Sequence, residues 1–141
     1  MHLVATSALI GVLWDSLLPI LGWVTYPNGM LAAGTAPHWM VALWMMFATT
    51  MNLSLAWMKR SLWLAAILGA TGGPLSYWAG AELGALTFTP GTETAALVLL
   101  GIGWGVLTPL LVILARRWNG FAPPPAPDVP LAPAPLEAEG A

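Results

Sequence analysis

Charged side chains are scarce in this sequence. Of its 141 residues, 7% are Asp, Glu, Lys or Arg, whereas 58% are hydrophobic. A soluble globular domain carries about 25% charged residues, so the composition excludes an ordinary water-soluble domain. Four basic residues stand against six acidic ones, which gives no positive field that could attract nucleic acid. We therefore expect a protein whose solvent is the lipid bilayer and which binds no nucleic acid.

Cysteine is absent altogether. Its absence excludes disulfide bonds, thiolate metal sites and thiol catalysis. The two histidines, His2 and His38, are far apart in the sequence, and a lone histidine is weak evidence for a metal. The sequence also lacks a phosphate-binding loop, a nucleophile elbow and a zinc-protease motif. We therefore expect no metal and no cofactor.

Four long apolar segments, in contrast, stand out, each near the ~20 residues that a membrane-spanning helix needs. They cover residues 3–24, 39–58, 61–88 and 95–115. They predict an all-α, polytopic membrane domain of four transmembrane helices within residues 1–118. Trp14, Asp15 and the lack of a basic amino end argue against reading the first segment as a signal peptide. Residues 119–141 are rich in proline and alanine and end in acidic residues, which predicts a disordered tail.

The basic residues predict the orientation of this bundle. All of them lie at two places, Lys59-Arg60 and Arg116-Arg117, and the loops at residues 25–38 and 87–94 contain none. The positive-inside rule therefore places both termini and the Lys59-Arg60 turn in the cytoplasm. Four spans also require both termini on one side. The turn at Lys59-Arg60 is very short, so the second and third segments are predicted to form an antiparallel hairpin.

Asp15 is predicted to lie near the middle of the first span. A carboxylate at that depth is disfavoured by about 2.5–3.5 kcal/mol on the insertion scale, so Asp15 should be protonated, paired or directed into a polar cavity. Ser7, Gly11 and Leu18 share its helical face, which permits close approach by another helix. One interpretation is a proton or cation site, or a catalytic acid. The other is a buried carboxyl that only makes structural hydrogen bonds.

Further polar positions come to the same depth from the second and third segments. Gly72, Gly73 and Pro74 together disfavour a helix by about 5 kcal/mol relative to alanine, which predicts a break in the third helix. Carbonyls freed there could accept a proton from Asp15 or coordinate a cation, although a proline kink that only shapes the bundle is also consistent. In the second segment, Met45, Thr49, Asn52, Ala56 and Lys59 share one helical face, and Asn52 alternatively serves as interhelical glue. The predicted mid-membrane cluster is Asp15, Thr49, Thr50, Asn52, Gly72, Gly73, Pro74, Ser76 and Tyr77.

Three motifs in order along the chain carry a family resemblance. They are WDSLL at residues 14–18, PHWMVALW at 37–44 continuing in FATTMNLSL at 47–55, and GATGGPLSYWAG at 69–80. Over about residues 3–115 the chain resembles Domain of Unknown Function 2878, a family of small bacterial inner-membrane proteins. The resemblance implies a multi-pass protein of that membrane but no assigned activity.

Three functions remain open on the sequence. We expect a non-enzymatic accessory or scaffold subunit near lipid or envelope enzymes, with the bilayer and a membrane protein or a second copy as partners. The first alternative is a small proton- or cation-coupled transporter whose site combines Asp15 with the broken third helix. The second is an intramembrane lipid-modifying enzyme that uses Asp15 and Tyr77 as acid–base groups.

Overall fold

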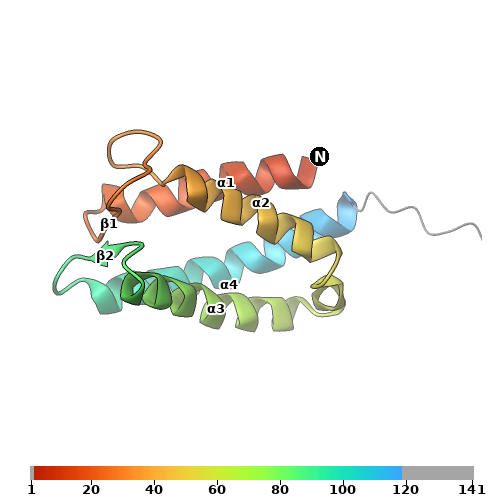
Figure 1. Cartoon of the computed structure of the whole chain (residues 1–141). Coiled ribbons are helices and arrows are strands. Elements are labelled where there is room, and N and C mark those ends of the chain that lie inside the picture. Colours follow the sequence, from red (N-terminus) through yellow and green to blue (C-terminus); the bar gives the residue numbers. More distant parts are fainter. Residues whose placement is uncertain (1, 119–141) are drawn as a thin grey trace, which may run out of the picture.

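Four helices dominate the computed structural model, which describes residues 2–118. Its elements are α1 (His2–Ile20), β1 (Val24–Thr25), α2 (His38–Asn52), the 3₁₀ helix η1 (Ala56–Arg60), α3 (Leu62–Glu82), β2 (Thr87–Phe88) and α4 (Glu93–Arg117). The helices run alternately up and down the bundle (Figure 1). The predicted all-α class is thereby confirmed. The predicted tail at residues 119–141 lies outside the described residues.

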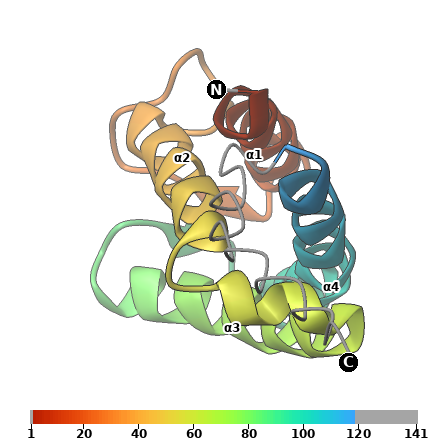
Figure 2. The same cartoon turned by 90° about the vertical axis from the view of Figure 1, so that its right-hand side faces the viewer.

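The helices pack as two antiparallel pairs. α1 packs against α2, and α3 packs against α4 over the largest helix–helix interface of the bundle. Smaller contacts of α4 with α1 and α2 join the two pairs. Figure 2 shows the four helices end-on, with α4 beside α1 and across the bundle from α2. The predicted hairpin of the second and third segments is thus not a packed pair. η1 stands between α2 and α3 and carries the chain from one pair to the other.

Two glycines end helices at the loop end of the bundle. After α1, Gly22 adopts a φ of +72°, and the Trp23 amide donates to the Leu18 carbonyl at 3.0 Å. After α3, Gly84 adopts a φ of +76°, in the left-handed region that glycine enters without a steric penalty. The two loops that follow meet in the short antiparallel pairing of β1 with β2. The first and third helices therefore end before the apolar segments at residues 3–24 and 61–88 do.

The expected break at Gly72-Gly73-Pro74 does not occur, because α3 continues through all three residues. Pro74 removes the amide that would have bonded the Ala70 carbonyl. That carbonyl instead faces Gly101 of α4, where an added Cβ would lie 3.2 Å from the oxygen. Close packing on α4 thus covers the point where the helix lacks a hydrogen bond. The small-residue spacing at Gly69/Gly73 and Gly101/Gly105 serves this same interface.

The outer surface of the bundle is strongly apolar. Large hydrophobic side chains are exposed on every helix, including Leu9, Leu13, Leu43, Met46, Ile67, Leu75, Ile102 and Val106. The buried interior, by contrast, contains polar side chains, namely Ser7, Asp15, Ser16 and Thr108. Two helices, α1 and α4, are long and apolar enough to cross a membrane.

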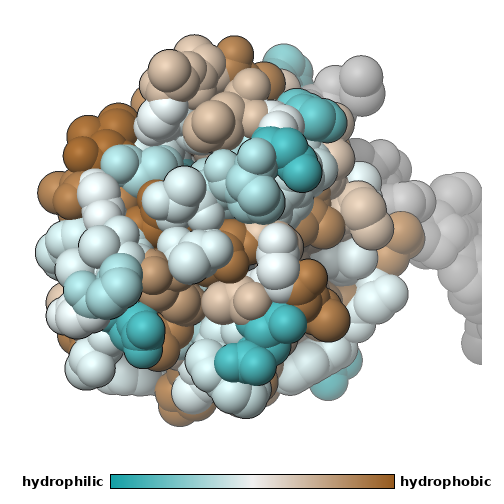
Figure 3. Space-filling model, turned by 60° about the vertical axis from the view of Figure 1, so that its left-hand side comes forward, coloured by the Kyte–Doolittle hydropathy of each residue, from teal (hydrophilic) through white to brown (hydrophobic). Residues whose placement is uncertain are grey.

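The two ends of the bundle differ in charge. η1 and the end of α4 lie together at the right of Figure 1, and the Arg116 guanidinium there donates to the Lys59 carbonyl. All four basic residues therefore share one end. Glu82 and Glu93 mark the other end, where the loops around β1 and β2 lie. Figure 3 turns that loop end forward and shows teal and pale side chains interspersed with brown ones.

Candidate functional site

Asp15 lies at the centre of the polar interior. Its exposed fraction is 0%, and both of its carboxyl oxygens are occupied by donors from other helices. The Trp44 indole Nε1 donates to Oδ2 at 2.5 Å, and the Tyr77 hydroxyl donates to Oδ1 at 2.6 Å. Asp15 therefore joins α1 to α2 and α3 at one point. The buried face of α1 that presents it also carries Ser7, Gly11 and Leu18, as the helical spacing predicted.

Hydrogen bonding extends from Asp15 into the loop after α1. The Tyr26 hydroxyl lies 3.5 Å from the Tyr77 hydroxyl, whose own proton is directed at Asp15. Tyr26 can therefore donate to the Tyr77 oxygen. Burial is the main cause that raises the pKa of Tyr26 from 10.0 to about 12. The adjacent loop is also fixed, because the Ala36 amide donates to Ser16 Oγ at 2.9 Å.

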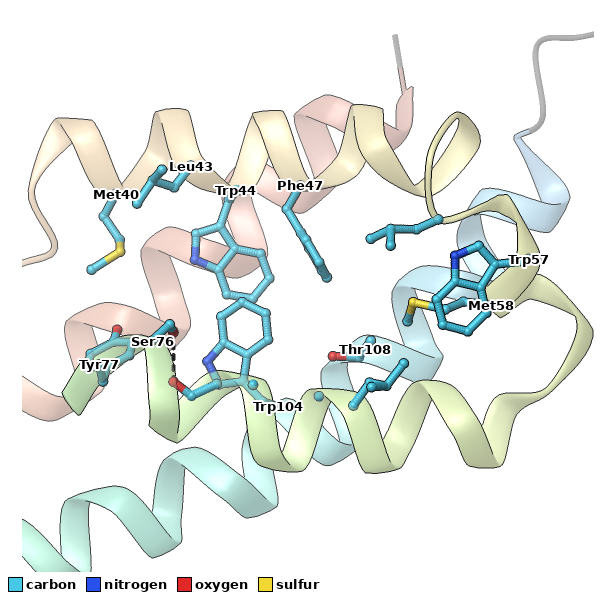
Figure 4. A pocket seen from close by; sticks show the side chains of 15 residues that line it. Met40, Leu43, Trp44, Phe47, Trp57, Met58, Ser76, Tyr77, Trp104 and Thr108 are labelled. Atoms are coloured by element: carbon cyan, nitrogen blue, oxygen red, sulfur yellow. Dashed lines mark hydrogen bonds between the residues drawn. The ribbon is translucent and has the colours of Figure 1, made fainter. Parts of the chain in front are cut away.

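An apolar cavity of about 510 Å³ lies between α2 and α3. Figure 4 shows Met40, Leu43, Trp44 and Phe47 on its α2 side and Tyr77 at one end. η1 closes the opposite end with Trp57 and Met58, and α4 contributes Trp104 and Thr108. Trp104 stacks on Trp44, with ring centroids 4.6 Å apart. Asp15 does not line the cavity and lies behind the wall that Trp44 and Tyr77 form.

Gly72 and Gly73 have different surroundings in this wall. A Cβ added to Gly73 would lie 2.3 Å from the Trp104 ring, so this glycine is needed for close packing of α3 on α4. A Cβ added to Gly72 would have no heavy atom within 4 Å, and Gly72 lines the cavity. Gly72 is also exposed, so a side chain at position 72 would meet open space beside the cavity.

The family model for "Protein of unknown function (DUF2878)" matches residues 1–110. The chain belongs to this family. The match includes α1, α2, α3 and most of α4, and thus Asp15 and both residues that donate to it. No curated protein and no solved structure matches the chain.

The DUF2878 chain brings only part of the predicted cluster to Asp15. Tyr77 bonds to it directly. Thr49 and Thr50 instead donate to the Met46 and Phe47 carbonyls of their own helix, at 2.7 and 2.8 Å. Neither threonine therefore joins the Asp15 cluster.

Asn52, Ser76 and Pro74 also bond or pack elsewhere. Asn52 Oδ1 accepts from Lys59 Nζ at 2.5 Å, near the basic end of the bundle. The Ser76 hydroxyl donates to the Gly73 carbonyl at 2.7 Å, beside the cavity. Pro74 packs on Gly101. The polar positions that sequence counting assigned to one depth thus serve several separate local contacts.

Sequence reasoning missed Trp44, because it assigned the wrong face of α2 to the bundle interior. The buried face consists of Met40, Trp44, Ala48 and Met51, whereas Met45 and Thr49 are exposed. The chemistry of Asp15 indicates which residue type to look for in the second segment. A buried carboxylate accepts from donors, and tryptophan Nε1 is a donor with no acceptor function. Trp44 is the tryptophan in the middle of the second segment of this DUF2878 chain.

The residues described in this DUF2878 chain offer no evident metal site. No group of three His, Asp or Glu side chains gathers anywhere in residues 2–118. Asp15 is surrounded by two tyrosines and a tryptophan, which supply hydrogen-bond donors and no strong metal ligand. These donors fix the position of the Asp15 carboxyl group. Asp15, Tyr77 and Tyr26 form a connected chain of hydrogen bonds.

Proposed function

We propose that this chain is a four-span membrane protein with both termini in the cytoplasm. Exposed leucine, isoleucine, valine and methionine on all four helices support this placement, because water-soluble monomers rarely expose such contiguous apolar surface. α3 has 21 residues, which at 1.5 Å per residue is about 30 Å, the thickness of the hydrocarbon core. α2 has 15 residues and needs η1 to reach the basic end.

The grouping of the basic residues supports the orientation. Lys59, Arg60, Arg116 and Arg117 share one end of the bundle, and the opposite loops contain no lysine or arginine. The positive-inside rule then assigns the basic end to the cytoplasm. With the bacterial origin that the family resemblance implies, the membrane is the bacterial inner membrane.

We further propose that the protein acts as a non-enzymatic accessory subunit beside lipid or envelope enzymes. One observation supports the non-enzymatic part of this proposal: Asp15 is fully buried, both carboxyl oxygens bond to donors of the chain itself, and the cavity does not reach it. A catalytic acid must contact its substrate, whereas a structural carboxyl must be buried with its hydrogen bonds satisfied, as Asp15 is. The transporter hypothesis loses its second component, because α3 is not broken and offers no free half-helix ends.

Partner capture and substitution of Asp15 test the accessory role together. The tagged protein is purified from its native membrane, in wild-type form and as Asp15→Asn. The proposal expects the same enzyme to copurify with both forms and the lipid profile of the cells to be unchanged by Asp15→Asn. A lipid profile that changes with Asp15→Asn as it does on deletion of the gene, in a variant that still folds, would contradict the proposal.

An intramembrane enzyme is the second candidate, favoured by one feature. Tyr77 lines the cavity and donates to Asp15 at 2.6 Å, so a substrate in the cavity would lie beside a tyrosine whose oxygen is polarised by a carboxylate. Tyr77→Phe removes that hydroxyl and keeps the ring. Loss of a lipid product in Tyr77→Phe cells with normal protein levels would favour this candidate over the accessory role.

A further inference from the structure

We propose that the cavity between α2 and α3 binds the acyl chain of an anionic phospholipid from the cytoplasmic leaflet, with the phosphate at Lys59 and Arg60. The inference goes beyond the accessory role and rests on the membrane placement proposed above.

The cavity has the size of a hydrocarbon chain. Its volume is about 510 Å³, within the range of small-molecule sites. An apolar cavity of about 150 Å³ in another protein holds one benzene molecule, and by that measure this cavity holds about twenty carbon atoms. A helix is 10–12 Å across, so a single turn would fill a comparable volume. A single chain therefore fits the cavity better than a partner helix does.

The lining of the cavity is mainly apolar. It consists of aliphatic, aromatic and methionine side chains, together with glycine and the hydroxyl-bearing residues Ser76, Tyr77 and Thr108. The Thr108 hydroxyl and Trp104 Nε1 have no hydrogen-bond partner among residues 2–118. The hydroxyls of Ser76 and Tyr77 are already engaged by Gly73 and Asp15. Leu43, Leu68 and Trp57 line the cavity and are also exposed on the outside of the bundle. A chain can thus enter sideways from the surrounding lipid without crossing a polar barrier.

Two basic residues follow one end of the cavity in the sequence. Trp57 and Met58 of η1 line that end (Figure 4). Lys59 and Arg60 are the last two residues of η1 and do not themselves line the cavity. Arg60 is exposed, and among residues 2–118 no carboxylate forms an ion pair with it. Glu82 and Glu93 are at the opposite end of the bundle. Among residues 2–118, no carboxylate lies at the basic end, so a phosphate headgroup there would meet positive charge while its chain extends toward Tyr77.

Gly72 gives the proposal a direct test. Gly72 lines the cavity and is exposed, and an added Cβ would meet no heavy atom within 4 Å, so Gly72→Leu is expected to obstruct the cavity and leave the helix pairs intact. Thr71→Leu is the matched control, because Thr71 is exposed one residue earlier on α3 and does not line the cavity. Ser76→Leu fills the same cavity from the next turn and serves as the second blocking variant.

The experiment uses phosphatidylglycerol with a diazirine in one acyl chain, incorporated into bilayers of phosphatidylcholine that contain the whole protein. After photolysis, mass spectrometry locates the labelled peptides. We expect label on residues 40–47 and 68–77, reduced about tenfold by Gly72→Leu and by Ser76→Leu and less than twofold by Thr71→Leu. Lys59→Gln with Arg60→Gln should lower labelling to that obtained with diazirine phosphatidylcholine of the same chain length.

Three results would overturn the proposal. Unchanged labelling in both blocking variants would show that the chain is not in the cavity. Label spread equally over the outer face of α4 around Val106 would show only general contact with lipid. Equal labelling of the wild type by phosphatidylglycerol and phosphatidylcholine would remove the headgroup site at Lys59 and Arg60. The cysteine-labelling pattern described below tests the membrane placement separately.

Discussion

The Tyr77 hydroxyl donates to Asp15 Oδ1 across 2.6 Å, although 62 residues separate the two in the sequence. With the Trp44 indole on the other oxygen, this contact fixes three helices to one carboxyl group. The pairs α1–α2 and α3–α4 otherwise pack mainly within themselves. Asp15 therefore links the two helix pairs through its hydrogen bonds. Its substitution should show how much these bonds contribute to the free energy of unfolding.

Asparagine and leucine at position 15 should differ in stability. In Asp15→Asn the amide oxygen can accept from Trp44 and the amide nitrogen can donate to Tyr77, whose proton then turns to Tyr26. Asp15→Leu leaves the Trp44 indole without an acceptor and leaves Tyr77 only the Tyr26 hydroxyl, 3.5 Å away. A buried donor without an acceptor costs about 1–3 kcal/mol. We expect Asp15→Leu to lower the free energy of unfolding by about 3 kcal/mol and Asp15→Asn by about 1 kcal/mol. Unfolding in mixed detergent micelles measures both, and equal values would show that the hydrogen bonds do not matter.

The two neighbouring glycines of α3 should respond in opposite directions to alanine. Gly73→Ala places a methyl group against the Trp104 ring, and overpacking of this kind costs about 1–3 kcal/mol. Gly72→Ala meets open space and removes the entropic penalty of glycine in a helix, a gain of about 0.5–1 kcal/mol. The same unfolding assay applied to the pair checks this. A loss of stability in Gly72→Ala as large as that in Gly73→Ala would contradict the assignment of their environments.

Alkaline pH should weaken the fold through Tyr26. Because the pKa of Tyr26 is raised from 10.0 to about 12, the folded protein holds this proton more tightly than the unfolded chain does. The resulting stability is complete below pH 10 and is lost as the pH rises through 12. The expected loss is about 2 kcal/mol by the upper end of this window. Tyr26→Phe should lose less over the same window, and identical pH profiles would rule out Tyr26 as the cause.

Thr108 offers a substitution that should stabilise the protein. Its hydroxyl is buried and has no partner among residues 2–118, an arrangement that costs about 1–3 kcal/mol. Thr108→Val keeps the shape and removes the hydroxyl, so the free energy of unfolding should rise by about 1 kcal/mol. Thr92→Val is the control, because the Thr92 hydroxyl donates to the Thr89 carbonyl at 2.8 Å. Its removal should lower the free energy of unfolding. A loss of stability in Thr108→Val would point to a partner for that hydroxyl.

Much of the fold follows from the spacing of apolar residues. The four helices and the buried stripe of Ser7, Gly11, Asp15 and Leu18 are periodic features that one segment carries by itself. The placement of α3 beside α4, with α2 set apart from α3, depends on η1. The short basic sequence at this turn does not predict a 3₁₀ helix. The periodicity within one segment therefore predicts a helix well, but it does not predict which helices pack against each other.

The candidate site was harder to predict because its contacts are tertiary. Asp15 and Tyr77 were identified by chemistry and depth, but depth counting also drew in Thr49 and Thr50, which bond within their own helix. Propensity suggested a break at Gly72-Gly73-Pro74, yet packing against Gly101 and Trp104 keeps α3 continuous. Tertiary packing prevailed over intrinsic helix propensity at this position. The cavity beside Gly72 could not be deduced from any one segment.

Cysteine labelling in intact cells tests the central claim, the four-span placement with the basic end inside. The chain has no cysteine of its own, so single substitutions report without background. Ala33→Cys and Leu83→Cys lie exposed at the loop end, and Ser54→Cys and Ala56→Cys lie exposed toward the basic end. A membrane-impermeant maleimide should label positions 33 and 83 in intact cells, and positions 54 and 56 only after permeabilisation. Labelling of all four in intact cells, or the reverse pattern, would contradict the account.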